Sequence, residues 1–175
     1  MKHVAIYPGT FDPIHFGHID IAIRAASIFD ELVVAVYDKP AKQLLFSAKE
    51  RGKLAQQALA DLPNVRVTSY SGLTVEFAYE VEAQAIVRGL RATNDFELEY
   101  QMALINRKLA PEIEFICLMT RQDYAFLSSS VVKEVALLGG DVSSMVPPHV
   151  ASALEIKRRE REKNHQPAPV VSLRD

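Results

Sequence analysis

The chain has 175 residues, of which 49% are apolar and 24% are charged, as is typical of one globular domain. Its 20 basic and 22 acidic side chains give a formal net charge of -2, which argues against a dedicated nucleic-acid-binding protein. No apolar stretch approaches the roughly 18 residues that a membrane span requires, and the first apolar run reaches Pro8 too early for a signal peptide. We therefore expect a cytoplasmic protein whose partners include neither nucleic acid nor membrane.

The chain contains a single cysteine, Cys117, which excludes an internal disulfide and a Cys-rich zinc site. Cys117 lies inside the apolar run 115–119. That position predicts a small buried side chain rather than a nucleophile.

Apolar runs of strand length alternate with segments of helical period along most of the chain. The runs are nearly continuous and rich in β-branched and aromatic residues, which predicts parallel strands buried on both faces at 4–7, 32–37, 65–69, 85–88 and 115–119. The segments of helical period predict helices at about 18–29, 48–60, 75–82, 95–109, 131–138 and 148–160. This alternation predicts an α/β fold with a Rossmann-like, doubly wound, five-stranded parallel sheet and helices on both faces.

Local signals mark several ends of the predicted helices. Ser47 with Glu50, and Asn94 with Glu97, match the capping-box pattern at two helix starts. Gly139, followed by a second glycine, predicts a left-handed helix end. We expect one domain over residues 1–157, followed by a tail at 158–175 that is first charged and then Pro-containing and flexible.

The loop after the first predicted strand carries the most distinctive motif. It reads Gly-Thr-Phe-Asp-Pro at 9–13 and His-x-Gly-His at 15–18, and the chain contains neither GxGxxG nor the P-loop pattern. A helix start offers free N–H groups to phosphate, Thr10 adds a hydroxyl donor, and Gly17 permits close approach of a ligand. Spacing alone leaves three readings of His15 and His18: zinc ligands, packing or capping residues, or part of a phosphate site.

Three other loops after predicted strands carry cations or hydroxyl groups. Lys39 and Lys42 follow the second strand, and Arg88 and Arg91 flank a glycine at the end of the fourth. Arginine forks bind phosphate oxygens in pairs, although an ion pair with Asp95 or Glu99 is the structural alternative. Three serines at 128–130 open a helix after the fifth strand.

All four loops would face the same edge of a parallel sheet, where ligands bind in such folds. The sequence suggests no Ser-His-Asp set and no paired carboxylates in a loop. Cations, hydroxyl groups and backbone amides without an evident base fit phosphoryl or nucleotidyl transfer, in which positioning and charge stabilisation dominate.

The motif at 7–18 resembles the signature of the HxGH-type nucleotidyltransferase superfamily. Further segments, in register over about residues 1–155, resemble bacterial phosphopantetheine adenylyltransferases: 88–91 (Arg-Gly-Leu-Arg), 95–97 with Glu99, 106–107, and 128–135 (Ser-Ser-Ser-Val-Val-Lys-Glu-Val). The resemblance implies transfer of AMP from ATP to 4′-phosphopantetheine, giving dephospho-coenzyme A and pyrophosphate, the penultimate step of coenzyme A synthesis. It also implies Mg²⁺ as cofactor and a homohexamer.

The resemblance assigns roles to individual positions and implies no metal ligand among the side chains. The implied catalytic residues are His18, Lys42, Arg91 and Thr10. The implied substrate-binding residues are Thr10, Lys42, Thr74 and Arg88. The implied ATP-binding residues are Thr10, Phe11, His18, Gly89, Leu90, Arg91, Glu99, Tyr124, Ala125, Phe126, Leu127, Ser128, Ser129 and Ser130. The alternatives are another small nucleotidyltransferase, such as a nicotinamide mononucleotide adenylyltransferase, and a non-catalytic nucleotide-binding domain.

Overall fold

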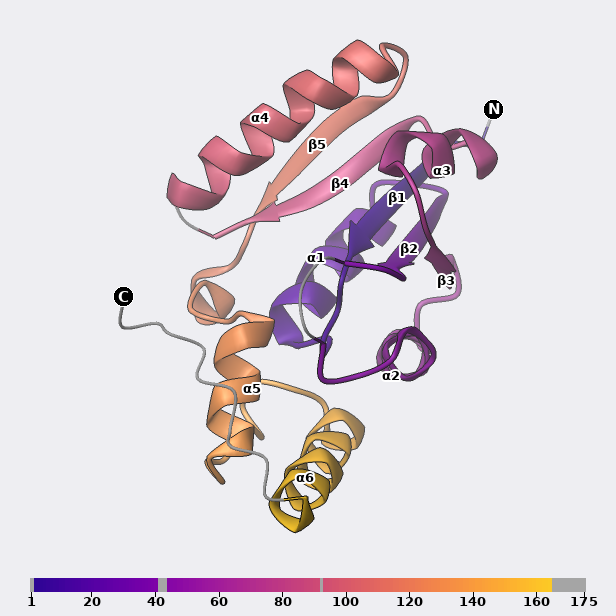
Figure 1. Cartoon of the computed structure of the whole chain (residues 1–175). Helices are drawn as coiled ribbons and strands as arrows, with labels where there is room; N and C mark the ends of the chain where they lie inside the picture. The colour runs from indigo at the N-terminus through magenta and orange to yellow at the C-terminus, as the bar shows by residue number, and fades with distance from the viewer. Residues whose placement is uncertain (1, 41–43, 92, 165–175) are drawn as a thin grey trace.

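The chain folds around one parallel sheet (Figure 1). A computed structural model describes residues 2–40, 44–91 and 93–164. The strands are β1 (Val4–Gly9), β2 (Glu31–Tyr37), β3 (Val65–Tyr70), β4 (Ala85–Leu90) and β5 (Glu114–Met119). Their order across the sheet is β3-β2-β1-β4-β5, so the chain builds outward from β1 to one edge and then returns to the other side of β1. The predicted five-stranded parallel α/β fold is confirmed.

Every predicted helix is present. The helices are α1 (Phe16–Ala26), α2 (Ala48–Ala58), α3 (Thr74–Glu80), α4 (Thr93–Leu109), α5 (Ser129–Leu137) and α6 (Pro148–Lys163), with a short 3₁₀ turn η1 (Gln122–Tyr124) before α5. The Ser47–Glu50 capping box is confirmed, and Gly139 has the predicted left-handed conformation, with φ of 83°. The cap predicted at Asn94 is wrong, because α4 already begins at Thr93.

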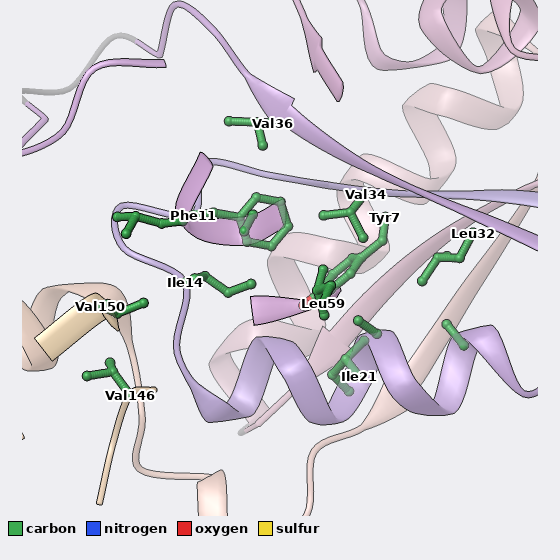
Figure 2. Packing of buried hydrophobic residues seen from close by; sticks show 14 of the residues in the cluster. Tyr7, Phe11, Ile14, Ile21, Leu32, Val34, Val36, Leu59, Val146 and Val150 are labelled. Carbon is green, nitrogen blue, oxygen red and sulfur yellow. The ribbon is translucent and has the colours of Figure 1, made fainter. Parts of the chain in front are cut away.

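The central strands β1, β2 and β4 are largely buried on both faces, which explains why they read as continuous apolar runs. Alternate side chains of a strand point to opposite faces, so Ala5 and Tyr7 pack with α1, α2, α5 and α6, while Val4 and Ile6 pack with α3 and the segment after α4. The first of these clusters also contains Phe11 and Ile14 from the loop after β1, which Figure 2 shows together with residues of β2 and α6. The loop that carries the distinctive motif is therefore anchored in the core.

The two edge strands, β3 and β5, depart from the prediction of strands buried on both faces, because each has exposed and half-buried residues along most of its length. Cys117 is exposed, so the buried side chain predicted for it is wrong. Met119, at the end of the same strand, is 67% exposed. A strand at the edge of a sheet has a neighbour on one side only, and an apolar run cannot reveal which strand takes that place.

Helix α6 packs onto the same core as the sheet and runs through most of the charged segment to Lys163, three residues past its predicted end. Val150 and Leu154 are fully buried there. Residues 165–175 lie outside the described residues, so the predicted domain boundary near 157 stays a prediction. None of the helices in the described ranges is long and apolar enough to cross a membrane.

Replacing Leu154 by Ala tests whether α6 folds together with the sheet. Because this side chain is fully buried in the main cluster, its truncation should lower the free energy of unfolding by about 2–5 kcal/mol within a single transition. Urea unfolding measures this effect. Ile156→Ala is the matched control: Ile156 is 58% exposed on the same helix, and its loss should cost about 0.5 kcal/mol or less. Equal effects of the two substitutions, or a separate transition for α6, would contradict the shared core.

Candidate active site

The candidate site lies where β1 and β4 diverge. Their register pairs end at Ile6 and Ile86, although the two strands continue to Gly9 and Leu90. By contrast, β1 pairs with β2 over its whole length. This is the point at which the strand order reverses, where open parallel sheets bind their ligands.

Two cavities open at this edge of the sheet, with volumes of about 340 Å³ and about 370 Å³. The first lies beside α1 and the start of α5, and the second lies between β3, α3 and α4. Both are lined by Pro8, Gly9, Thr10, Arg88 and Glu99. Two ligands, one in each cavity, would therefore meet at these residues.

His18 lines the first cavity, and contacts with His15 and Phe11 fix its ring. The N–H of His15 donates to Nδ1 of His18 at 3.3 Å, the two imidazole rings stack at 3.7 Å, and Phe11 meets the His18 ring edge-on at 5.0 Å. Because Nδ1 accepts a hydrogen bond, the proton of a neutral His18 is assigned to Nε2. The two histidines thus form a packed and oriented unit.

Two glycines of the site are required by the protein's own packing. A Cβ atom at Gly17 would lie 3.1 Å from the His15 ring, and one at Gly89 would lie 3.1 Å from Ile21 of α1. The sequence analysis attributed Gly17 to close approach of a ligand. The structure gives a second reason, because these glycines let the His15 ring and α1 pack closely.

Arg88 bridges the diverging strands. Its Nη1 donates to the Pro8 carbonyl at 2.6 Å, while Nε and Nη2 bind the Glu99 carboxylate of α4 at 2.6–2.9 Å. Burial disfavours the charge on Arg88, but the hydrogen bonds and charge of Glu99 outweigh it, so the pKa of Arg88 is raised. The Arg88 side chain remains 33% exposed, so a ligand in either cavity can reach the guanidinium.

Arg91 ties the loop after β4 to the segment before α5. Its guanidinium binds Asp95 at 2.9 and 3.0 Å and donates to the Leu127 carbonyl at 2.8 Å. The ion pairs named as the structural alternative for the two arginines therefore exist, with Glu99 for Arg88 and Asp95 for Arg91. Both arginines also line the first cavity, so this geometry is compatible with phosphate binding as well.

The start of α5 presents hydroxyl groups and backbone amides to the first cavity. Ser128 is the N-cap and accepts from the Val131 N–H at 3.1 Å, while Ser129 donates to the Pro13 carbonyl at 2.9 Å. Ser129 thereby joins α5 to the loop after β1. The positive end of a helix dipole at this position favours an anionic ligand.

The structure brings most of the predicted site residues together. Those that line the first cavity are Thr10, Phe11, His18, Arg88, Gly89, Arg91, Glu99, Tyr124, Ser128, Ser129 and Ser130. Thr74 lines the second cavity, where its hydroxyl lies 3.0 Å from that of Tyr70. Leu90, Ala125, Phe126 and Leu127 are not among the lining residues of either cavity, and Lys42 lies outside the described residues.

Sequence reasoning missed the buried charges under the loop after β1. Asp12 is 1% exposed, accepts from the N–H groups of Leu45 and Phe46, and pairs with Lys133 of α5 at 2.8 Å. Arg51 of α2 is fully buried. An isolated Arg in an amphipathic helix reads as a surface residue, so nothing in the local sequence marked Arg51.

The apolar wall of the second cavity was also missed. Met102, Ile105 and Leu109 of α4 line it together with Leu73 and Val75. Their spacing along α4 is what places them on one side of the helix, but helical spacing alone does not separate a core face from a ligand cavity.

The two carboxylates that line the first cavity are each paired with an arginine, Asp95 with Arg91 and Glu99 with Arg88. Across the described part of the chain, no group of three or more His, Cys, Asp or Glu side chains could hold a metal. The zinc reading of His15 and His18 thus lacks its further ligands among these residues. Magnesium commonly uses one or two carboxylates together with substrate phosphates, and Asp95 and Glu99 line the cavity.

The fold and the site together indicate the class of protein to which this chain belongs. A family model described as cytidylyltransferase-like matches residues 6–135. A protein of Vibrio parahaemolyticus, provisionally described as a nicotinate-nucleotide adenylyltransferase, has the same fold with a TM-score of 0.69 and 20% identity, over 91% of this chain and 97% of that one. The protein is thus a cytidylyltransferase-like nucleotidyltransferase by fold.

Comparison with curated relatives narrows this class. The phosphopantetheine adenylyltransferase of Thermomicrobium roseum is 57% identical over 162 residues, covering 91% of this chain and 97% of the relative. That of Chloroflexus aurantiacus is 52% identical, covering 90% and 98%. The chain belongs to the phosphopantetheine adenylyltransferase family.

The burial of His15 predicts a dependence of stability on pH. Burial and, to a lesser extent, the charge of Arg91 lower the pKa of His15 from 6.5 to about 3. Below pH 6.5, His15 is protonated in the unfolded chain but stays neutral in the folded chain. The free energy of unfolding should therefore decrease as the pH is lowered from 6.5 to 3. The contribution is up to about 1.4 kcal/mol per pH unit.

Urea unfolding of the original protein and of His15→Asn at pH 7, 6 and 5 measures this contribution. Asn does not titrate and is favoured at a helix N-cap, the position that His15 occupies. The variant should lose stability less steeply as the pH falls. Equal slopes for the two proteins would show that His15 is protonated as readily in the folded chain as in the unfolded one.

Proposed function

We propose that this site transfers the adenylyl group of ATP to the phosphate of 4′-phosphopantetheine, giving dephospho-coenzyme A and pyrophosphate. One observation of the structure carries the proposal: two cavities of similar volume meet at Thr10 and Arg88, as a reaction between two bound ligands requires. The identity of 52–57% with phosphopantetheine adenylyltransferases supports this choice of substrates.

The reaction needs little acid–base chemistry from the protein. An oxygen of the phosphopantetheine phosphate forms a bond to the α-phosphorus of ATP, and the bond from that phosphorus to the bridging oxygen of the β-phosphate breaks. Pyrophosphate leaves with the electron pair. Because the attacking phosphate is already anionic, no general base is required, and the protein's task is to align the ligands and stabilise charge.

The first cavity suits ATP. Its phosphates would face the starts of α1 and α5, with the hydroxyl groups of Ser129 and Ser130 nearby. His18, with its proton on Nε2, would donate to an oxygen of the α-phosphate, where negative charge grows in the transition state. Arg91, held by Asp95, would bind the phosphates or the leaving group.

The second cavity suits the acceptor. Leu73, Met102, Ile105 and Leu109 offer an apolar wall to the pantetheine arm. Arg88 would hold the acceptor's phosphate beside Thr10, and Lys42 is the further cation implied by the resemblance. Mg²⁺ would enter with ATP as part of the substrate, neutralising charge on the phosphates. We place this activity in the cytoplasm.

We also propose that the chain acts as a homo-oligomer, which the family resemblance specifies as a hexamer. One face of α4 supports this: Phe96, Tyr100 and Leu104 lie on one side of the helix and are 52–55% exposed. Large apolar side chains gathered on one exposed helix are typical of an interface between proteins. A second copy of this chain is the occupant we propose.

Pyrophosphate release tests the substrates. ATP, Mg²⁺ and 4′-phosphopantetheine together should release pyrophosphate and produce the mass of dephospho-coenzyme A, whereas omission of the acceptor should abolish both. Release with nicotinamide mononucleotide instead would replace the proposed acceptor by the alternative one. Binding of ATP without release for either acceptor would favour a nucleotide-binding domain without catalysis.

The same assay on His18→Ala tests the site. Loss of one donor to the transition state should lower kcat by about two to three orders of magnitude with a modest change in ATP affinity. Exposed His3 provides the matched control, and His3→Ala should leave turnover unchanged. A weakened ATP affinity at unchanged kcat would contradict the role of His18.

Light scattering on a sizing column tests the oligomer. The mass should be six times that of the 19.5 kDa chain, and Tyr100→Glu should lower it by placing a charge on this face of α4. Leu138→Glu, at a leucine that is 70% exposed near the end of α5, should leave the mass unchanged. A monomeric original protein would refute the proposal.

A further inference from the structure

Arg51 is a buried cation whose partners are backbone carbonyls. Its side chain is 0% exposed, and the guanidinium donates to the carbonyls of Phe46 (Nε, 3.2 Å), Thr10 (Nη1, 2.6 Å), Tyr37 (Nη1, 2.8 Å) and Asp38 (Nη2, 3.2 Å). Burial lowers the pKa of Arg51, and the charges of Asp12 and Asp38 partly offset this. A buried charge is costly unless its hydrogen bonds are made.

The four carbonyls belong to three different segments of the chain. Thr10 lies in the loop after β1, Tyr37 and Asp38 stand at the end of β2, and Phe46 precedes α2. The planar fork of one arginine reaches all of them in fixed directions. Arg51 therefore holds the loop after β1 against the end of β2, although it lines neither cavity itself.

Thr10 connects this bond network to the chemistry. Thr10 lines both cavities and therefore lies where the two ligands would meet. Its carbonyl forms the shortest of the four bonds of Arg51. Asp12, two residues further along, fixes the same loop through Phe46 and Lys133, so the loop is held at two points by buried charges.

An apolar side chain could fill the space of Arg51 but would leave four carbonyls without donors. The loop would then shift towards water or towards other donors. A shift of about 1 Å near reacting atoms can lower a rate by about two orders of magnitude. Arg91, which is held by Asp95 and the Leu127 carbonyl, has no bond to this loop or to Arg51 and would keep its place.

We propose that Arg51 is a positioning residue of the transfer reaction, which acts by fixing the backbone of Thr10 at the junction of the two cavities. This inference rests on the proposed function. Loss of a residue with this role changes kcat and the KM for the acceptor more than it changes the KM for ATP. A residue that only supports the fold affects the fraction of folded protein and nothing else.

Steady-state kinetics of Arg51→Met and Arg51→Lys, with urea unfolding of both, test the proposal. In the folded Met variant, kcat should fall about 10- to 100-fold, the KM for ATP should change little, and the KM for phosphopantetheine should rise. The Lys variant keeps one charge and part of the donor set, so its kcat should lie between those of the Met variant and the original protein. If the Met variant does not fold, the kcat and KM values of the Lys variant test the proposal.

Leu54→Ala is the matched control, because Leu54 is buried on the same helix but has no role at the cavities. It should lower the free energy of unfolding and leave kcat per folded molecule unchanged. The proposal is overturned by folded Arg51 variants with unchanged kcat, by an equal loss of kcat in Leu54→Ala, or by failure of both Arg51 variants to fold. An original protein without phosphopantetheine-dependent release would instead refute the proposed function, before any variant is compared.

Discussion

The divergence of β1 from β4 is the constraint on which the site depends. The two strands pair as far as Ile6 and Ile86 and then separate, which leaves their last residues free to line cavities. The separated end of β1 is held by an arginine on each side: Arg88 binds the Pro8 carbonyl, and Arg51 binds that of Thr10. Arg88 thus supplies a hydrogen bond to the part of β1 that β4 no longer pairs with, and it does so without closing the space between the strands.

The sheet and its helices were predictable because their signals are local. Burial on both faces turns a parallel strand into a continuous apolar run, and all five strands were found within three residues of their predicted ends. Helix starts were predictable where a side chain makes the cap, as Ser47 does. The clustering of the loops after β1, β4 and β5 followed from topology alone, because parallel strands bring their carboxyl ends to one edge of the sheet, whereas Lys39 of the loop after β2 lines neither cavity.

What could not be predicted depends on partners distant in the sequence. Cys117 looked buried because an apolar run does not show that its strand lies at the edge. Arg51 looked like a surface residue because its carbonyl partners include Thr10, 41 positions away. The partners of Arg88 and Arg91 stayed undecided, since the same spacing fits carboxylates or phosphates. In the structure each guanidinium is held by a carboxylate, which orients it at the cavity before any ligand arrives.

Helix α4 joins the chemistry to the proposed contact between copies. It carries Glu99, which holds Arg88, and its residues Met102, Ile105 and Leu109 line the second cavity while remaining 47–52% exposed. One helix therefore separates this cavity from the surface, and part of its apolar wall faces water. A second copy packed on the side of α4 that carries Phe96, Tyr100 and Leu104 would restrain the helix that positions Glu99. Occupancy of the acceptor cavity and association through α4 are thus expected to strengthen each other, because both order the same helix.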